Sequence, residues 1–218
     1  MTGKVEPPRG ARRLLEISGP GARTRPWSPL VGRSALWVGL VAYLRVLYRA
    51  IEHERAIDLS EVVVTADTVV ILDGEILNKP KDRDDAIRIL SSLSGKTHQV
   101  MTGVSIVSRQ KEEHFDDTTE VTFRDLTLEE IEFYIDHFQP YDKAGAYGAQ
   151  DTLPEGMNPC SQEEMRFLRS IEKEYIIEQT VTPPPADKRI VVIKQISGSY
   201  FNVMGLPIHI VYSHLDGW

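Results

Sequence analysis

The sequence EVVVTADTVVILDGEILNKPKD (residues 61–82) decides the fold. Its β-branched residues predict a strand over 61–72, the Asp-Gly pair at 73–74 predicts a tight turn, and 75–78 supply a short return strand. One acid, Asp67, interrupts the apolar strand, and two lysines around a proline follow the hairpin. A carboxylate within a hydrophobic strand costs free energy unless it is paired, hydrogen-bonded or bound to a metal. The acid is therefore a candidate functional residue.

Helix and strand patterns alternate along the rest of the chain. Apolar spacing predicts helices over 47–59, 81–95, 128–138 and at the C-terminus. Further strands are predicted over 98–109, 115–126 and 189–196. Gly95 is typical of the residue just past a helix end, and Glu130 completes a capping box with Thr127. Strands interleaved with helices predict an α/β domain.

The composition is that of a soluble globular protein with an uneven charge. The net charge of −7 combines +7 in residues 1–50 with −14 in residues 51–218. An acidic body repels phosphates, so nucleic acid is not an expected partner. No apolar run approaches the roughly 20 residues that span a bilayer, so no membrane role is expected. The single cysteine, Cys160, excludes an intramolecular disulfide and favours a reducing compartment, the cytoplasm.

Residues 1–50 form an atypical N-terminal segment. They contain eight arginines, five prolines and six glycines, without a clean helical or strand period before about residue 35. A targeting segment, a plain extension and a misassigned start or reading frame all fit this composition. Residues 51–218 are expected to form the main domain, with an insert at about 151–188.

The candidate site combines an acid, three lysines and two glycine-rich loops. Asp67 could hold a divalent cation, deprotonate water or do both, but it could also be a solvated acid or a turn cap. Lys79 and Lys81 project from an extended segment, although a solvated loop before a helix would look the same. The loops 139–151 and 198–205 could expose backbone N–H groups to an anion, and Lys143 adds charge. Together these groups suit a triphosphate.

Five motifs in series point to a known family. They are TADTVV (65–70), ILNKPKDRDDAIRILSSLSGKTHQVMTGV (76–104), EVTFRDLTLEEIEFYI (120–135), DKAGAYGAQ (142–150) and GSYFNVMGLP (198–207). The series resembles the Maf family of nucleoside triphosphate pyrophosphatases. The resemblance implies an elongated mixed sheet flanked by helices, like that of inosine triphosphate pyrophosphatases, and a homodimer. It also implies hydrolysis of dTTP or UTP, and of modified pyrimidine nucleotides, to the monophosphate and pyrophosphate.

The resemblance also assigns roles to individual residues. Asp67 falls on the proton acceptor of the family and is expected to contact a divalent metal ion, Mg²⁺ or Mn²⁺. Thr68 and Gln150 fall on positions tied to base choice, and their identities resemble the dTTP/UTP branch. The residues expected to bind the substrate are Lys79, Lys81, Lys143 and Arg12.

Two departures from the family pattern affect these expectations. The family opens with S-P-R-R-x-E-L-L after a strand, whereas PPRGARRLLE (7–16) lacks the serine and the strand. The 47 residues between Gln150 and Gly198 exceed the expected length. Within them Ser161 and Glu164 form a capping box, which predicts one helix over 164–179 with an apolar stripe. We assign packing and no chemistry to this helix. The alternative function is a catalytically impaired Maf-like nucleotide-binding protein in cell-division control.

Overall fold

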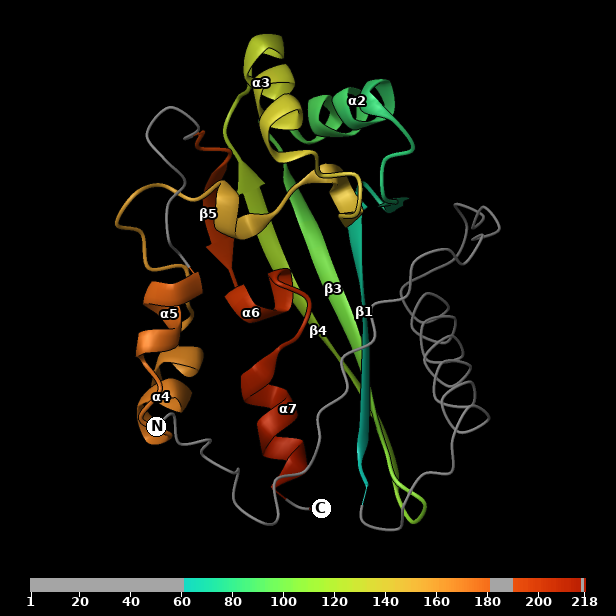
Figure 1. Ribbon diagram of the computed structural model, residues 1–218, viewed down its shortest axis with the longest axis vertical. Helices are drawn as coiled ribbons and strands as arrows, with labels where there is room; N and C mark the ends of the chain where they lie inside the picture. Colours follow the sequence, from blue (N-terminus) through green and yellow to red (C-terminus); the bar gives the residue numbers. More distant parts are fainter. Residues whose placement is uncertain (1–60, 181–189, 217) are drawn as a thin grey trace, which may run out of the picture. The chain divides into compact units, whose positions relative to one another are not determined.

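The computed structural model describes residues 61–180, 190–216 and 218 (Figure 1). The predicted helix over 47–59 and the atypical segment 1–50 lie outside these residues. The described residues form two compact units, one with 61–67 and 103–115 and the other with 68–102 and the described part of 116–218. A five-stranded sheet has the order β2-β1-β3-β4-β5, with helices between its strands along the chain. The predicted α/β class is confirmed.

The opening hairpin forms as its sequence predicts. The strands β1 (Val63–Leu72) and β2 (Glu75–Leu77) pair antiparallel, with Val70 opposite Leu77. Asp73 and Gly74 have φ angles of 52° and 85°. A type I′ turn requires positive φ at both central residues, so the Asp-Gly pair fixes the register.

Two capped helices follow this hairpin and pack against each other (Figure 1). They are α2 (Arg83–Leu93) and α3 (Leu128–Phe138). The Asp82 side chain caps α2, and Thr127 and Glu130 form the predicted capping box of α3. Arg83 donates hydrogen bonds of 2.8 and 3.0 Å to the carboxylate of Asp136, which ties the two helices together at their exposed edge.

The long strands of the sheet are β3 (Thr97–Val107) and β4 (Glu112–Phe123), and β5 (Ile193–Ser197) is their short neighbour. β4 ends three residues before the predicted 126, because the Leu126 N–H donates to Ser94 Oγ at 2.8 Å instead of joining the ladder. β5 begins at Ile193, because the N–H of the preceding Val192 donates to the Thr152 carbonyl at 2.9 Å. β4 and β5 pair antiparallel with a bulge after Thr122.

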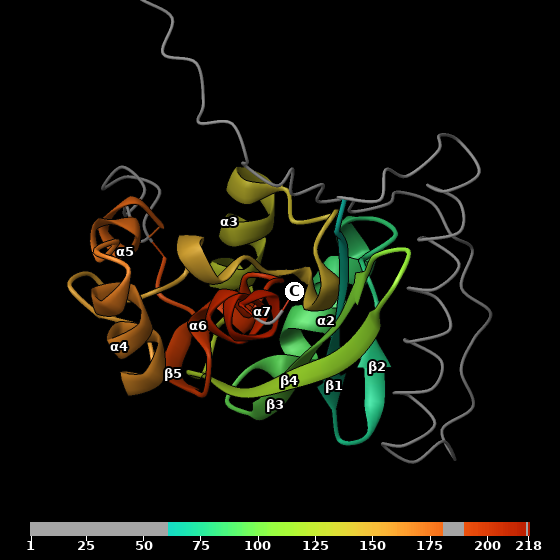
Figure 2. The same ribbon diagram turned by 90° about the horizontal axis from the view of Figure 1, so that it is seen from below.

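The remaining elements come from the second half of the chain. They are the 3₁₀ turns η1 (Ala144–Ala146) and η2 (Ala149–Asp151), and the helices α4 (Gln162–Ser170), α5 (Tyr175–Thr180), α6 (Tyr200–Val203) and α7 (Ile208–Leu215). The insert helix expected to be continuous is broken, with Glu172 at a φ of 57°. α4 packs against α7 within the larger unit (Figure 2). The Phe167 and Tyr212 rings lie 5.2 Å apart.

The core of the larger unit lies where α2 and α3 cover the sheet. Its fully buried side chains include Leu90 and Leu93 of α2, Tyr134 of α3, and Val121 and Phe123 of β4. Burial of each such aliphatic or aromatic side chain stabilises the fold by about 1.5–3 kcal/mol. None of the helices described is long and apolar enough to cross a membrane.

Candidate active site

Asp67 and Thr68 are neighbours near the middle of β1 and are both half-buried. The Thr68 hydroxyl lies 2.8 Å from the Thr102 hydroxyl of β3. Asp67 belongs to the compact unit of residues 61–67 and 103–115, whereas the three candidate lysines belong to the other unit. The expected grouping of Asp67 with the lysines stays a prediction, and Arg12 lies outside the described residues.

The backbone of the segment with Lys79 and Lys81 is held in place, whereas the two lysine side chains are exposed. Pro80 between them is buried, and the Lys81 N–H donates to the Asp85 carboxylate at 3.1 Å, just ahead of α2. Both lysine side chains are exposed, and neither ammonium forms an ion pair with another described residue. Two exposed ammonium groups on an anchored segment can bind an anionic ligand, and the charge of Lys81 also helps to lower the pKa of the nearby Asp85 carboxyl.

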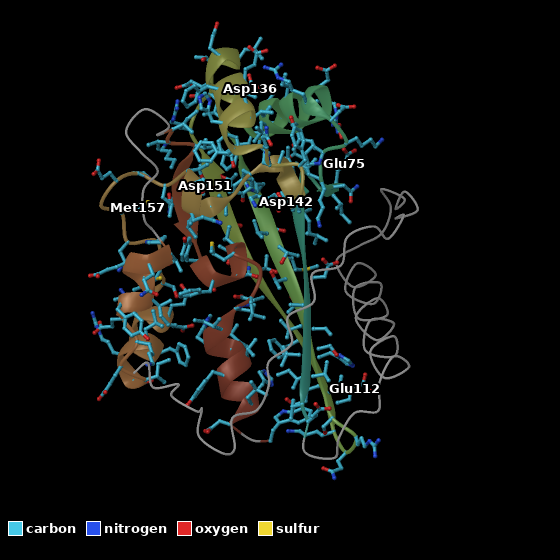
Figure 3. The ribbon with its side chains drawn as sticks, in the orientation of Figure 1. Glu75, Glu112, Asp136, Asp142, Asp151 and Met157 are labelled. Atoms are coloured by element: carbon cyan, nitrogen blue, oxygen red, sulfur yellow. The ribbon has the colours of Figure 1, made fainter. Side chains whose placement is uncertain are left out.

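Lys143 has a different setting, because it lies among acids. Its ammonium is 3.4 Å from the Asp142 carboxylate. Burial raises the pKa of Asp151, and the positive charge of Lys143 partly opposes that rise. Figure 3 shows that Asp142 and Asp151 both project from the loop that carries this lysine. A phosphate group would therefore compete with carboxylates for Lys143. Lys79 and Lys81 form no ion pair with the described residues, so a phosphate would displace none there.

The glycines of the 139–151 loop serve close packing, which corrects part of the anion-loop prediction. Gly145 has a φ of 71°, and a Cβ there would lie 3.0 Å from Val70 of β1. The Gly148 N–H donates to the buried Tyr134 hydroxyl at 2.9 Å and is not available to an anion. The loop also packs against α2 through η1, so one helix supports both lysine-bearing segments.

Gln150 lies in η2 and is half-buried. The Thr152 hydroxyl donates to the carbonyl groups of Gly148 and Ala149, which holds this turn from beneath. The Gln150 side-chain amide has no hydrogen-bond partner among residues 61–180 and 190–216. The amide can both donate and accept, so it is suited to a nucleobase edge.

The second glycine-rich loop is also bonded internally. A Cβ on Gly198 would lie 2.8 Å from Thr119 Oγ1, so the glycine allows a close approach to β4. The Asn202 amide donates to the Val100 carbonyl at 3.0 Å and to Thr119 Oγ1 at 2.9 Å. The prediction that this loop offers N–H groups to an anion is wrong for Ser199 and Asn202, because their N–H groups bind protein oxygens.

Asp67 is the residue that the family resemblance predicts to contact a metal ion. No group of three or more His, Cys, Asp or Glu side chains in the described ranges could hold a metal ion. Burial raises the pKa of the Cys160 thiol to about 12, and Glu164 adds to this rise, so the thiol is an inert group. A lone carboxylate is the donor set of an ion that shares its coordination with water and substrate.

A family model described as Maf-like protein matches residues 42–157. This range includes Asp67, Thr68, the three candidate lysines and Gln150, and it ends before α4 and before the loop 198–205. The chain belongs to the Maf family. The resemblance predicted from the five motifs is therefore confirmed, and the segment containing α4 and α5 lies outside the matched range.

Three curated relatives of this Maf protein are each named dTTP/UTP pyrophosphatase. The relative from Porphyromonas gingivalis strain W83 is 39% identical over 156 residues, which cover 72% of this chain and 61% of the relative. The relative from Bacteroides fragilis strain YCH46 is 38% identical over 167 residues, covering 77% and 68%. The relative from Bacillus velezensis strain FZB42 is 38% identical over 147 residues, covering 67% and 59%. The chain thus spans 61% of the length of the first of these relatives.

Proposed function

We propose that this Maf protein is a nucleoside triphosphate pyrophosphatase that hydrolyses dTTP and UTP to the monophosphate and pyrophosphate. The observation that carries the proposal is its 39% identity to a protein named dTTP/UTP pyrophosphatase. The exposed ammonium groups of Lys79 and Lys81, anchored ahead of α2, support the same conclusion. The nucleotide-binding alternative without turnover is motivated by the missing S-P-R-R pattern alone, and the relatives named dTTP/UTP pyrophosphatase do not favour it.

The proposed reaction needs charge neutralisation more than covalent chemistry. Water attacks the α-phosphorus, the bond to the bridging oxygen breaks, and pyrophosphate leaves with that oxygen. Asp67 accepts the proton of the attacking water. Lys79 and Lys81 bind the phosphate oxygens, whose negative charge increases on the leaving group in the transition state. Lys143 takes part once a phosphate displaces the carboxylates around it.

A divalent metal ion is part of the proposal. Mg²⁺ is commonly held by one or two carboxylates together with substrate phosphates and water, and the Asp67 carboxylate fits this pattern. Asp67 would hold the ion, with Mn²⁺ as the substitute. When bound, the cation supplies positive charge to the phosphate oxygens.

The base would be chosen by Thr68 and Gln150. The Gln150 amide offers a donor and an acceptor to a pyrimidine edge. Thr68 contributes a hydroxyl that β3 holds in place through Thr102. We expect the enzyme to work as a homodimer in the cytoplasm, and the single cysteine supports that compartment.

The test measures initial rates of pyrophosphate release from dTTP, UTP, CTP and GTP with Mg²⁺. We expect dTTP and UTP to have the highest kcat/KM, and Asp67→Asn to abolish release while UTP still binds. Binding of UTP by the wild-type protein without any release would overturn the enzyme and support the nucleotide-binding alternative. A preference for GTP would overturn the assignment to the dTTP/UTP branch.

A further inference from the structure

Glu164 is a buried carboxylate in the segment to which the sequence assigns no chemistry. It lies in the first turn of α4, and its side chain is 0% exposed, whereas its neighbour Glu163 is exposed. The capping box explains one of its contacts, the 2.7 Å hydrogen bond from the Ser161 N–H. A capping box does not by itself require burial, since Glu130 forms the same box on α3 with its side chain 34% exposed.

The other three hydrogen bonds to the Glu164 carboxylate all come from the start of α6. Oε1 accepts from the Ser199 hydroxyl at 2.6 Å and from the Phe201 N–H at 2.9 Å. Oε2 accepts from the Tyr200 N–H at 3.1 Å in addition to Ser161. Four donors and no acceptor surround the carboxylate, which matches the acceptor-only chemistry of its ionised form. Glu164 therefore clamps the GSYFN loop of the Maf pattern to the inserted segment.

A chain of hydrogen bonds continues from this clamp to β1, and its members all lie in one compact unit. Ser199 Oγ accepts the Asn202 N–H at 2.9 Å. The Asn202 carbonyl accepts the Thr102 hydroxyl at 3.1 Å, and Thr102 Oγ1 lies 2.8 Å from Thr68 Oγ1. We call this chain the relay; its members are Glu164, Ser199, Asn202, Thr102 and Thr68.

The relay sets the direction of the last hydrogen bond. A hydroxyl has one proton to donate. Since Thr102 donates its proton to the Asn202 carbonyl, Thr68 must be the donor in the Thr68–Thr102 pair. Any further group that meets Thr68 Oγ1 must therefore donate a hydrogen bond to it. N3 of uracil and thymine carries a proton, whereas N3 of cytosine is an acceptor.

We propose that Glu164 is a positioning residue that acts through the relay to keep the Thr68 hydroxyl as an acceptor for the N3–H group of a uracil or thymine base. The inference rests on the proposed function for its substrate and deepens it, because it explains how UTP is distinguished from CTP. Without the carboxylate, the donors of Ser199, Tyr200 and Phe201 lose their acceptor, and the Asn202 carbonyl is no longer fixed against Thr102. The Thr102 hydroxyl can then donate its proton to Thr68 Oγ1, which reverses the direction of the Thr68–Thr102 hydrogen bond.

The first test reads the relay without any nucleotide. Threonine methyl groups are labelled with ¹³C, and their NMR spectra are compared for Glu164→Gln and for the matched control Glu163→Gln. The amide introduced by Glu164→Gln would present N–H donors to the N–H groups of α6, whereas position 163 is exposed. We expect shifts or broadening of the Thr68 and Thr102 methyl signals for Glu164→Gln alone. Unchanged signals at both threonines would overturn the relay.

The second test reads base selection. We expect Glu164→Gln to lower the ratio of kcat/KM for UTP to that for CTP about threefold to tenfold, the range of one hydrogen bond. Ser199→Ala should act in the same direction, and the two effects should not add, because both residues act through one relay. An equal loss for UTP and CTP would indicate a merely structural role and would overturn the proposal. If Glu164→Gln does not fold, the methyl signals and the UTP-to-CTP ratio of Ser199→Ala test the proposal instead.

The two tests separate this inference from the proposed function. If wild-type protein hydrolyses neither nucleotide but Glu164→Gln moves the Thr68 and Thr102 signals, the proposed function fails and the relay stands. The selectivity part is then decided by equilibrium binding of UTP and CTP. If the wild-type protein prefers UTP but Glu164→Gln changes neither the signals nor the ratio, the proposed function stands and Glu164 has no positioning role.

Discussion

Gly145→Ala tests how the loop between Lys143 and Gln150 is held on the sheet. Gly145 has a φ of 71°, and the three side-chain carbons of Val70 nearest to an added Cβ lie at 3.0, 3.1 and 3.2 Å. Gly74→Ala is a matched control, because its φ is 85° and nothing lies within 4 Å of an added Cβ. Both variants change the unfolded chain in the same way, so their difference isolates the contact with Val70.

The expected magnitudes follow from two separate costs. A left-handed backbone costs a residue with a Cβ about 1–2 kcal/mol, which applies to both variants. Forcing an extra carbon into a packed site costs about 1–3 kcal/mol more, which applies to Gly145→Ala alone. We therefore expect Gly145→Ala to lose about 2–5 kcal/mol, a large part of the roughly 5–15 kcal/mol that stabilises a typical domain.

Urea unfolding followed by circular dichroism measures both variants. The free energy of unfolding should fall by about 1–3 kcal/mol more for Gly145→Ala than for Gly74→Ala. Combining Gly145→Ala with Val70→Ala should cost less than the sum of the two, because the smaller side chain leaves room for the new methyl group. Equal losses for the two glycine variants, or full additivity with Val70→Ala, would refute the close contact.

Three further predictions concern charge, specificity and pH. Lys81→Ala should raise KM and lower kcat for UTP, because it removes a charge used more in the transition state than in the ground state; steady-state kinetics measure both. Gln150→Glu should weaken the preference for dTTP and UTP, measured as relative kcat/KM across the four nucleotides. Burial lowers the pKa of His98 from 6.5 to about 4, so the folded state resists its protonation. The stabilisation from neutral His98 is complete above pH 6.5. The free energy of unfolding, measured with urea, should fall by about 2 kcal/mol from pH 7 to pH 5.

Each of these predictions has its own control and its own contrary outcome. For Lys81, alanine substitution of the exposed Lys173 is the control. If Lys81→Ala has the kinetics of the wild type, Lys81 does not bind the substrate. An unaltered substrate ranking would remove Gln150 from base selection. For the pH dependence, a His98→Gln variant should lose the difference of about 2 kcal/mol. The same pH slope in this variant would assign the effect to other groups.

The local features of the fold were predictable because their causes are close together in sequence. The Asp73-Gly74 turn, the capping boxes of Thr127 and Ser161, and the helix end before Gly95 each depend on residues within a few positions.

The features that sequence reasoning missed depend on distant residues. Gly145 and Gly198 look like parts of anion-binding loops, but they are glycines because Val70 and Thr119 approach them closely. The sequence predicts Glu164 as a helix cap, yet three of its four hydrogen bonds reach residues 35 to 37 positions away. A helix-start glutamate gives no local signal of such contacts. The break after α4 was also missed, although the hydrogen bonds that form it are local, such as that from the Lys173 N–H to the Leu168 carbonyl.

The central claim is that this Maf protein cuts a pyrimidine triphosphate between its α and β phosphates with Asp67 as the proton acceptor. The most direct measurement is ³¹P NMR of UTP incubated with wild-type protein or Asp67→Asn in the presence of Mg²⁺. The account predicts UMP and pyrophosphate in equal amounts from the wild type and neither from the variant. Formation of UDP and phosphate, or unchanged turnover by Asp67→Asn, would contradict it.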